Sequence, residues 1–134
     1  MKRILYLSRA GSIGGSQRQL GYVIANLERT LYEPIVVCPN RGQFVDILRS
    51  WSVDTHILPL RPWRKFPAAL CRYLDAERLT SFARNEDVAL VHCSNLHLNG
   101  YALWIAKRLK IPSILHVRTP ICTRDVYKLS LIHI

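Results

Sequence analysis

The chain has 134 residues, 49% of them hydrophobic and 21% charged, which is typical of one soluble globular domain with a sizeable core. No apolar run approaches the roughly 18 residues that a membrane-spanning helix needs, and none near Met1 is long enough for a signal peptide. Nineteen lysines and arginines against nine aspartates and glutamates give a net charge of +10. This charge favours an anionic partner such as nucleic acid, a phosphorylated small molecule or an acidic membrane surface.

Strand-like apolar runs alternate with helical patterns along the chain. The expected strands cover residues 4–7, 34–38, 53–60, 87–92 and 113–117. The expected helices cover residues 16–31, 44–51, 67–84 and 98–109. This alternation predicts a parallel sheet covered on both faces, because each parallel crossover carries a helix. With right-handed crossovers we expect a doubly wound, Rossmann-like α/β fold with strand order 3-2-1-4-5.

The first connection, residues 8–16, is rich in glycine and is the main candidate site. Gly14 and Gly15 precede Ser16-Gln17-Arg18-Gln19, which fits a capping box with Ser16 at N-cap and Gln19 at N3. The first N–H groups of a helix lack internal partners and can bind an anion. The pattern is neither G-x-G-x-x-G nor a Walker A loop. The alternative is a tight strand–helix connection that binds no ligand.

Polar residues end the fourth and fifth predicted strands, next to the point where the strand order reverses. They are His92-Cys93-Ser94-Asn95 and His116-Val117-Arg118. Ligands of doubly wound sheets bind outside the carboxyl ends of the strands at this position. We therefore expect His116 to contact ligand, with His92, Ser94, Asn95 and Arg118 lining the same crevice. For any one histidine, a partly buried structural imidazole is the alternative. Metal binding by His92, Cys93, His97 and His116 is not expected, because their spacing fits no common ligand pattern.

A basic aromatic segment follows the third predicted strand. Trp63, Arg64, Lys65 and Phe66 combine cationic and aromatic side chains. Such a segment suits an anionic membrane surface, where aromatic rings lie at the headgroup level. Single-stranded nucleic acid is a weaker alternative, since no RNA-binding motif accompanies the charge. A solvated basic loop with its aromatic rings in the core is the other alternative.

The cysteines Cys38, Cys71, Cys93 and Cys122 are widely spaced and form no C-x-x-C pair. Their spacing favours reduced thiols in a cytoplasmic protein. The last ten residues, 125–134, resemble a translated sequencing adaptor more than a protein terminus. We expect residues 1–124 to form the domain, residues 125–134 to be non-native, and the natural protein to be longer.

Four segments share an order and spacing with a known family. They are Lys2-Arg3-Ile4-Leu5-Tyr6-Leu7 with Gly14-Gly15-Ser16-Gln17, Asp87-Val88-Ala89-Leu90-Val91-His92, Gly100 through Leu109-Lys110-Ile111-Pro112, and Ser113-Ile114-Leu115-His116-Val117-Arg118. Together they resemble the N-terminal, acceptor-side domain of the family 4 retaining glycosyltransferases, which have the GT-B architecture. The resemblance covers residues 2–120. Gln17, where the family often has Glu, and Thr119-Pro120 depart from the family pattern.

The resemblance implies an enzyme that transfers a sugar from a nucleotide-sugar to a lipid-linked or polysaccharide acceptor, with retention and without a required metal or other cofactor. It places Gly14 and Gly15 near the donor phosphates and acceptor, and His116 near the donor sugar. It also implies a C-terminal companion domain that grips the nucleotide, so this chain alone should be inactive. We expect a cytoplasmic protein, on the inner membrane face through the basic aromatic segment, and no nucleic-acid partner.

A second function remains open from the residues themselves. A stand-alone flavodoxin-like or receiver-like domain could use the glycine turn to hold a phosphate or a flavin. A receiver domain would need acidic residues after the first strand, where Ser8 and Arg9 stand. A flavin protein would be yellow on purification.

Overall fold

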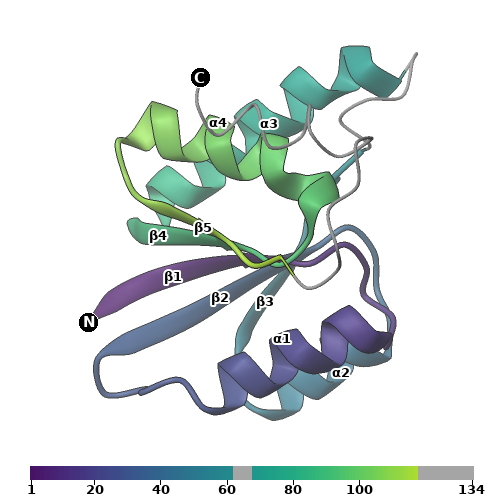
Figure 1. Cartoon of the computed structure of the whole chain (residues 1–134), viewed down its shortest axis with the longest axis vertical. Helices are drawn as coiled ribbons and strands as arrows, with labels where there is room; N and C mark the ends of the chain where they lie inside the picture. Colours follow the sequence, from purple (N-terminus) through teal and green to yellow (C-terminus); the bar gives the residue numbers. More distant parts are fainter. Residues whose placement is uncertain (62–67, 118–134) are drawn as a thin grey trace.

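The computed structural model of the chain describes residues 1–61 and 68–117. Its centre is a five-stranded sheet in the order β3-β2-β1-β4-β5, as predicted, and every neighbouring pair is parallel (Figure 1). The strands are β1 (Lys2–Leu7), β2 (Tyr32–Cys38), β3 (Asp54–Ile57), β4 (Val88–Cys93) and β5 (Ser113–Leu115). The α/β class and the strand order inferred from the sequence are therefore confirmed.

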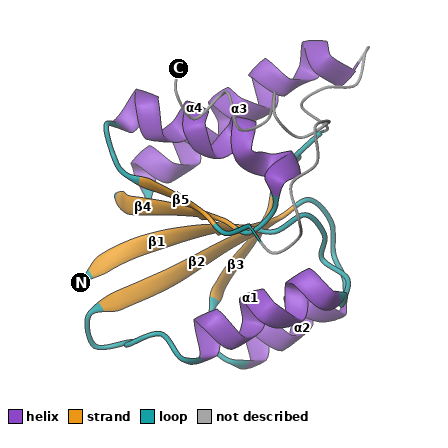
Figure 2. Cartoon of the chain, in the orientation of Figure 1, coloured by secondary structure: helices purple, strands orange, loops and turns teal. Residues whose placement is uncertain are grey.

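Two layers of helices cover the sheet. Figure 2 shows α1 (Gly15–Ala25) and α2 (Gln43–Ser50) on one face, and α3 (Ala68–Asn85) and α4 (Asn99–Leu109) on the other. A short 3₁₀ turn, η1 (Leu96–Leu98), joins β4 to α4. Among the described residues, no helix has the length and apolarity needed to cross a membrane.

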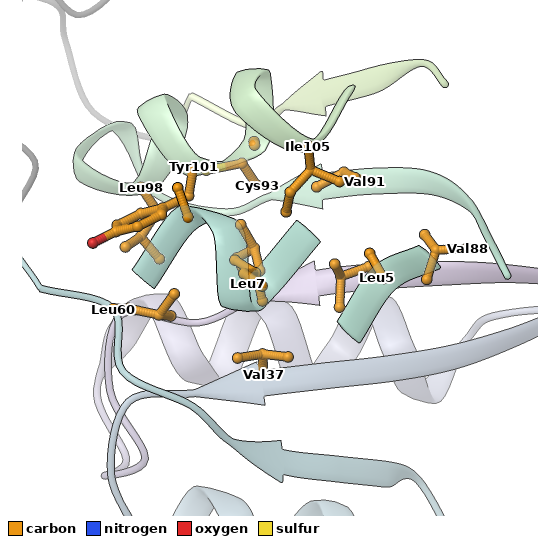
Figure 3. Close-up of a cluster of buried hydrophobic side chains, with 14 of the residues drawn as sticks. Leu5, Leu7, Val37, Leu60, Val88, Val91, Cys93, Leu98, Tyr101 and Ile105 are labelled. Carbon is orange, nitrogen blue, oxygen red and sulfur yellow. The ribbon is translucent and has the colours of Figure 1, made fainter. Parts of the chain in front are cut away.

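The core has two halves, because successive side chains of a strand point to opposite faces of the sheet. Leu5 and Leu7 of β1 pack under α3 and α4, in the cluster that Figure 3 shows with Val91, Tyr101 and Ile105. Ile4 and Tyr6 of the same strand pack on the other side, against α1 and α2. Burial on both faces explains why the strands appear in the sequence as continuous apolar runs.

The start and end of the first helix differ from the prediction. Gly14 is the N-cap, no side chain caps the helix, and the helix begins at Gly15, so the capping box at Ser16 is not formed. The helix ends at Ala25, and Leu31 is 59% exposed. Local side-chain bonds explain the early end: Asn26 Nδ2 donates to the Tyr22 carbonyl at 2.8 Å, and Glu28 Oε1 accepts from the Thr30 hydroxyl at 2.7 Å. Such local bonds compete with helix continuation.

Two strands are shorter than predicted. β3 covers residues 54–57 rather than 53–60, and β5 stops at Leu115 rather than residue 117. Pro59 cannot donate a ladder hydrogen bond, which limits β3. Pairing continues slightly beyond each strand, since the Leu58 N–H bonds the Cys38 carbonyl and the His116 N–H bonds the Cys93 carbonyl. The second bond fixes where His116 leaves the sheet.

Candidate active site

The carboxyl ends of β1, β4 and β5 are tied together at one edge of the sheet. Leu7 of β1 is paired with Cys93 of β4, and Cys93 with Leu115 of β5. The buried Ser94 hydroxyl donates to the Leu7 carbonyl at 3.0 Å. The chain therefore leaves these strands at adjacent positions, as the strand order predicts.

The connection after β1 is held by the connection after β2. The Gly11 N–H donates to Asn40 Oδ1 at 2.8 Å, and the Gly11 carbonyl accepts from the Phe44 N–H at 2.9 Å and the Val45 N–H at 3.4 Å. The N–H groups of Phe44 and Val45 belong to the first turn of α2. The Gly11 carbonyl thus occupies the position at which the N-terminus of α2 could have bound an anion.

The N-terminus of α1 is open by comparison. Among the described residues, no side chain caps it at Gly14, and its first turn holds no acidic residue. A Cβ added at Gly15 would meet no described atom within 4 Å, so a ligand can approach this backbone closely. Ser16 lies in the same turn, and the buried Gln17 folds back so that its Oε1 lies 2.8 Å from where a Gly14 Cβ would be. The helix start is therefore suited to an anion.

Two histidines lie next to each other at the ends of β4 and β5. The ring centroids of His92 and His116 are 6.0 Å apart, and the His92 ring lies 5.1 Å from the Tyr6 ring of β1. Both imidazoles are partly exposed. Sequence reasoning placed these residues in one crevice, and the structure brings them together.

Ser94 and Asn95 have structural partners. Besides the Ser94 bond to Leu7, Asn95 Oδ1 accepts from the His97 N–H at 2.8 Å and thereby caps η1. These bonds fix the backbone between β4 and α4. His97 itself is exposed on η1.

The buried thiols near this edge are protonated at neutral pH. Burial raises the pKa of Cys93 to about 12 and that of Cys38 to about 11. The Cys93 thiol donates to the Asn95 carbonyl at 2.8 Å. A thiol is a nucleophile or metal ligand only as the thiolate, so neither cysteine is suited to that chemistry. In residues 1–61 and 68–117, no three His, Cys, Asp or Glu side chains form a group that could hold a metal ion.

Sequence reasoning missed a polar cluster beyond β3. Asp75 of α3 is fully buried, and its Oδ2 accepts from the Arg61 N–H at 3.2 Å and lies 3.5 Å from Arg61 Nε. The Tyr101 hydroxyl of α4 donates to the Arg61 carbonyl. Asp75 lies directly before Ala76, which with Leu79 and Ala83 forms the buried side of α3. That helical spacing was the available signal: it places Asp75 beside the buried side of α3, where a carboxylate needs a partner.

The comparison with protein families decides which class of protein has this site. The family described as Glycosyltransferase Family 4 matches residues 13–131, which is most of the chain. The chain belongs to glycosyltransferase family 4.

Solved structures share the fold of this family 4 chain. HepE from Anabaena, in complex with UDP and glucose, has a TM-score of 0.74 at 14% identity, and the match covers 98% of this chain and 35% of HepE. MurG from Acinetobacter baumannii has a TM-score of 0.75 at 15% identity, covering 97% of this chain and 39% of MurG. A glycosyltransferase from Rickettsia africae has a TM-score of 0.69 at 18% identity, covering 92% and 32%. A comparison with curated protein sequences finds no match.

The family 4 chain spans about a third of the length of these three GT-B proteins. Several predicted residues lie outside its described part: Arg118, Trp63, Arg64, Lys65, Phe66, Cys122 and all of 125–134. Their roles stay predictions. The family match runs to residue 131 and so includes part of the segment that we expect to be non-native.

Proposed function

We propose that this chain is the N-terminal, acceptor-side domain of a retaining glycosyltransferase that uses a nucleotide-sugar. The observation that carries the proposal is the open start of α1 at Gly14 and Gly15, in a domain that belongs to family 4. The paired imidazoles of His92 and His116, at the ends of the neighbouring strands, support it. Family membership favours this function over a stand-alone phosphate- or flavin-binding domain.

The chemistry of sugar transfer suits such a site. As the glycosidic bond to the donor phosphate breaks, negative charge grows on the departing diphosphate, and the sugar becomes oxocarbenium-like. Backbone N–H groups at a helix start stabilise that negative charge without moving a proton. Because they are fixed by the fold, they need no reorganisation during the reaction. We assign this role to the first turn of α1, with Ser16 beside it.

His116 is our candidate for contact with the donor sugar. Its backbone is fixed by the bond from its N–H to the Cys93 carbonyl at 2.9 Å, and its ring lies beside His92. An imidazole at this position can donate a hydrogen bond to a sugar hydroxyl whether it is neutral or protonated. Ser94, Asn95 and Arg118 complete the proposed wall, and the mechanism that we propose needs no metal ion.

A companion domain is part of the proposal. This chain corresponds to about a third of the matched structures, and we propose that a second domain supplies the nucleotide site across a cleft. HepE was crystallised with UDP and with UDP-glucose, so UDP-sugars are the first donors to test. We place the enzyme in the cytoplasm, on the inner membrane face, with a lipid-linked or polysaccharide acceptor.

The test is to express the reading frame that continues beyond Arg124 together with residues 1–124, and to assay nucleoside diphosphate release with UDP-glucose, UDP-N-acetylglucosamine and GDP-mannose. We expect turnover with one donor from the longer protein and none from residues 1–124. The anomeric configuration of the product, read by NMR, tests retention. Strong turnover by residues 1–124 alone would contradict the two-domain proposal.

A further inference from the structure

A groove of about 250 Å³ lies between α1 and α2. Figure 1 shows these two helices on the side of the sheet away from α3 and α4. The groove extends along α2 from Gln43, the first residue of that helix, to Trp51, its C-cap. On the α1 side it is lined by Gln17, Arg18 and the residues one turn further on. The roles proposed so far for Gly14, Gly15, Ser16 and His116 do not involve this groove.

The absence of a side chain at Gly21 keeps the groove open. A Cβ at Gly21 would lie 3.7 Å from the Phe44 ring and 3.8 Å from the Trp51 ring, so anything larger would extend into the space between the helices. Tyr22 and Trp51 line the groove and remain 66% and 44% exposed. Contiguous exposed aromatic surface of this kind marks a binding site more often than scattered apolar residues do.

The lining combines apolar side chains with one positive charge. Ile13, Phe44, Ile47 and Trp51 supply its apolar surface. Within residues 1–61 and 68–117, Arg18 is the one charged residue of the lining, and no acidic residue lines it. A bare glycan would place hydroxyl groups against the apolar part of the lining, which is unfavourable, because only Gln17, Arg18, Tyr22 and Gln43 offer polar side chains. A hydrocarbon chain with an anionic head fits both parts of the lining.

One end of the groove adjoins the proposed reaction site. Gln17 lines the groove, and its Oε1 lies 2.8 Å from where a Gly14 Cβ would be. Arg18 follows in the same turn of α1. An anionic head beside Arg18 would therefore lie next to the open helix start, and a tail would extend from there along α2.

We propose that this groove binds the acceptor, and that the acceptor is a lipid phosphate. Its hydrocarbon chain lies along Phe44, Ile47 and Trp51, and its phosphate is held by Arg18 beside Gly14 and Gly15. This inference rests on the proposed function and deepens it, because it selects a lipid-linked acceptor over a free polysaccharide. It also explains why a glycine stands at position 21: glycine destabilises the interior of a helix, but here it leaves room for the ligand.

The test measures binding to the whole chain by calorimetry, with farnesyl phosphate as the probe and with farnesol and inorganic phosphate as separate arms. We expect farnesyl phosphate to bind at least about tenfold more tightly than farnesol, because the arginine adds a charge-assisted bond to the phosphate. Inorganic phosphate alone should bind too weakly to measure. Preference for farnesyl phosphate over both arms would separate lipid recognition from simple anion binding.

Two variants with matched controls locate the site. Gly21→Leu fills the groove and should weaken farnesyl phosphate binding at least about tenfold. Because the leucine side chain must fit beside the Phe44 and Trp51 rings, thermal unfolding of the variant is measured as well, which separates loss of binding from loss of folding. Ala25→Leu adds the same side chain at an exposed position of α1 and should leave binding unchanged. Arg18→Gln should reduce farnesyl phosphate affinity to that of farnesol, whereas Arg84→Gln, on the other side of the sheet, should not.

Several results would overturn the inference. One is that Gly21→Leu binds farnesyl phosphate as tightly as wild type does. The others are that wild type binds inorganic phosphate and farnesyl phosphate with equal affinity, or that it does not bind farnesyl phosphate. Sedimentation showing a dimer that Gly21→Leu disrupts would assign the groove to a second copy of the chain. Binding is measured without a donor, so it is independent of transfer. An enzyme active on a lipid-free glycan without farnesyl phosphate binding would overturn this inference and leave the proposed function standing.

Discussion

The Gly11 carbonyl accepts the Phe44 N–H at 2.9 Å, so the connection after β1 caps the helix that follows β2. The two helices on this side of the sheet consequently differ in what their N-termini can bind. At α2 a backbone carbonyl already satisfies the first N–H groups, whereas at α1 no side chain caps the helix. Of these two helix starts, we therefore propose the one at Gly14 and Gly15 as the ligand site.

The close approach of these connections predicts which glycines are essential for stability. A Cβ at Gly42 would lie 2.6 Å from the Gly11 carbonyl carbon, and a Cβ at Gly11 would lie 2.9 Å from the Asn40 carbonyl carbon. Both clashes are with backbone atoms, so relieving them requires a shift of the connections that the Gly11–Phe44 bond holds together. We expect Gly42→Ala and Gly11→Ala each to lower the free energy of unfolding by about 1–3 kcal/mol, measured by urea denaturation.

Gly15→Ala is the control for this series, since its Cβ would meet nothing within 4 Å. We expect it to change the free energy of unfolding by less than about 0.5 kcal/mol, as for an unhindered surface substitution. Equal destabilisation at positions 15 and 42 would show that glycine flexibility, rather than close packing, matters in these connections.

The buried thiols predict a loss of stability at alkaline pH. Burial raises the pKa of Cys38 to about 11 and that of Cys93 to about 12, from an ordinary value of 9.0. The folded state therefore holds these protons more tightly than the unfolded state. Their contribution is complete below pH 9 and is lost as pH rises from about 9 toward 11 and 12. We expect the free energy of unfolding to fall by about 1.4 kcal/mol per pH unit for each thiol.

Cys38→Ala and Cys93→Ala, singly and together, measure this effect. Each variant should flatten the dependence of the unfolding free energy on pH between 9 and 10, and the double variant most. Below pH 8 the variants should differ from wild type only by a constant offset from lost packing. The explanation fails if the double variant keeps the wild-type slope above pH 9.

The parallel sheet was predictable because the continuous apolar runs of 34–38 and 87–92 are typical of strands buried on both faces, and right-handed crossovers then limit the strand order. Helix ends were less predictable. The sequence at Ser16 fits a capping box, yet the N-cap is Gly14, two residues earlier, in a connection that is tied to Asn40 through the Gly11 N–H. A local motif contains no information on contacts 29 residues away, such as Gly11 with Asn40.

The candidate site was predictable to the same extent. Strand order alone brought His92 and His116 together, because the ends of adjacent parallel strands must meet. The groove beside α1 was not predictable, since it depends on how Trp51 and Phe44 pack around Gly21. The Asp75 cluster was missed for a related reason: a helical carboxylate is usually exposed, and only its spacing with Ala76 and Leu79 shows otherwise.

Asp75 and Tyr101 should be energetically coupled through Arg61. The Asp75 carboxylate holds the N–H and side chain of Arg61, and the Tyr101 hydroxyl donates to its carbonyl. We expect Asp75→Asn and Tyr101→Phe each to lower the free energy of unfolding by about 0.5–3 kcal/mol. The double variant should deviate from the sum by at least about 0.5 kcal/mol, because both substitutions act on one residue.

Thr80→Val provides the control for this cycle. The Thr80 hydroxyl bonds the Ala76 carbonyl within α3 and has no bond to Arg61. Its effect should add to that of Tyr101→Phe within about 0.5 kcal/mol. Additivity in the Asp75–Tyr101 cycle as well would mean that Arg61 is held by either partner independently.

Membrane contact through Trp63, Arg64, Lys65 and Phe66 predicts sedimentation with anionic vesicles. Wild type should sediment with phosphatidylglycerol vesicles and remain in solution with phosphatidylcholine vesicles, since surface attraction depends on lipid charge. Trp63→Ala combined with Arg64→Glu should weaken sedimentation several-fold. The control is Arg84→Glu on α3, which changes the net charge by the same amount as Arg64→Glu. Equal sedimentation of all three proteins would remove the membrane role of this segment.

The paired histidines predict a division of roles in the complete two-domain enzyme. If His116 contacts the donor sugar, His116→Ala should lower kcat by about 100-fold or more, as removal of one transition-state hydrogen bond does.

His92 packs between Tyr6 and His116, so we expect its role to be positioning. His92→Phe keeps a ring there and should preserve most of kcat, whereas His92→Ala should lower it. His97→Ala, at an exposed position of η1, is the matched control and should change kcat less than about twofold. Initial rates at saturating donor, with thermal unfolding of each variant, separate these roles from folding. A His116→Ala enzyme with unchanged kcat would exclude the proposed contact and make the histidine pair a packing feature.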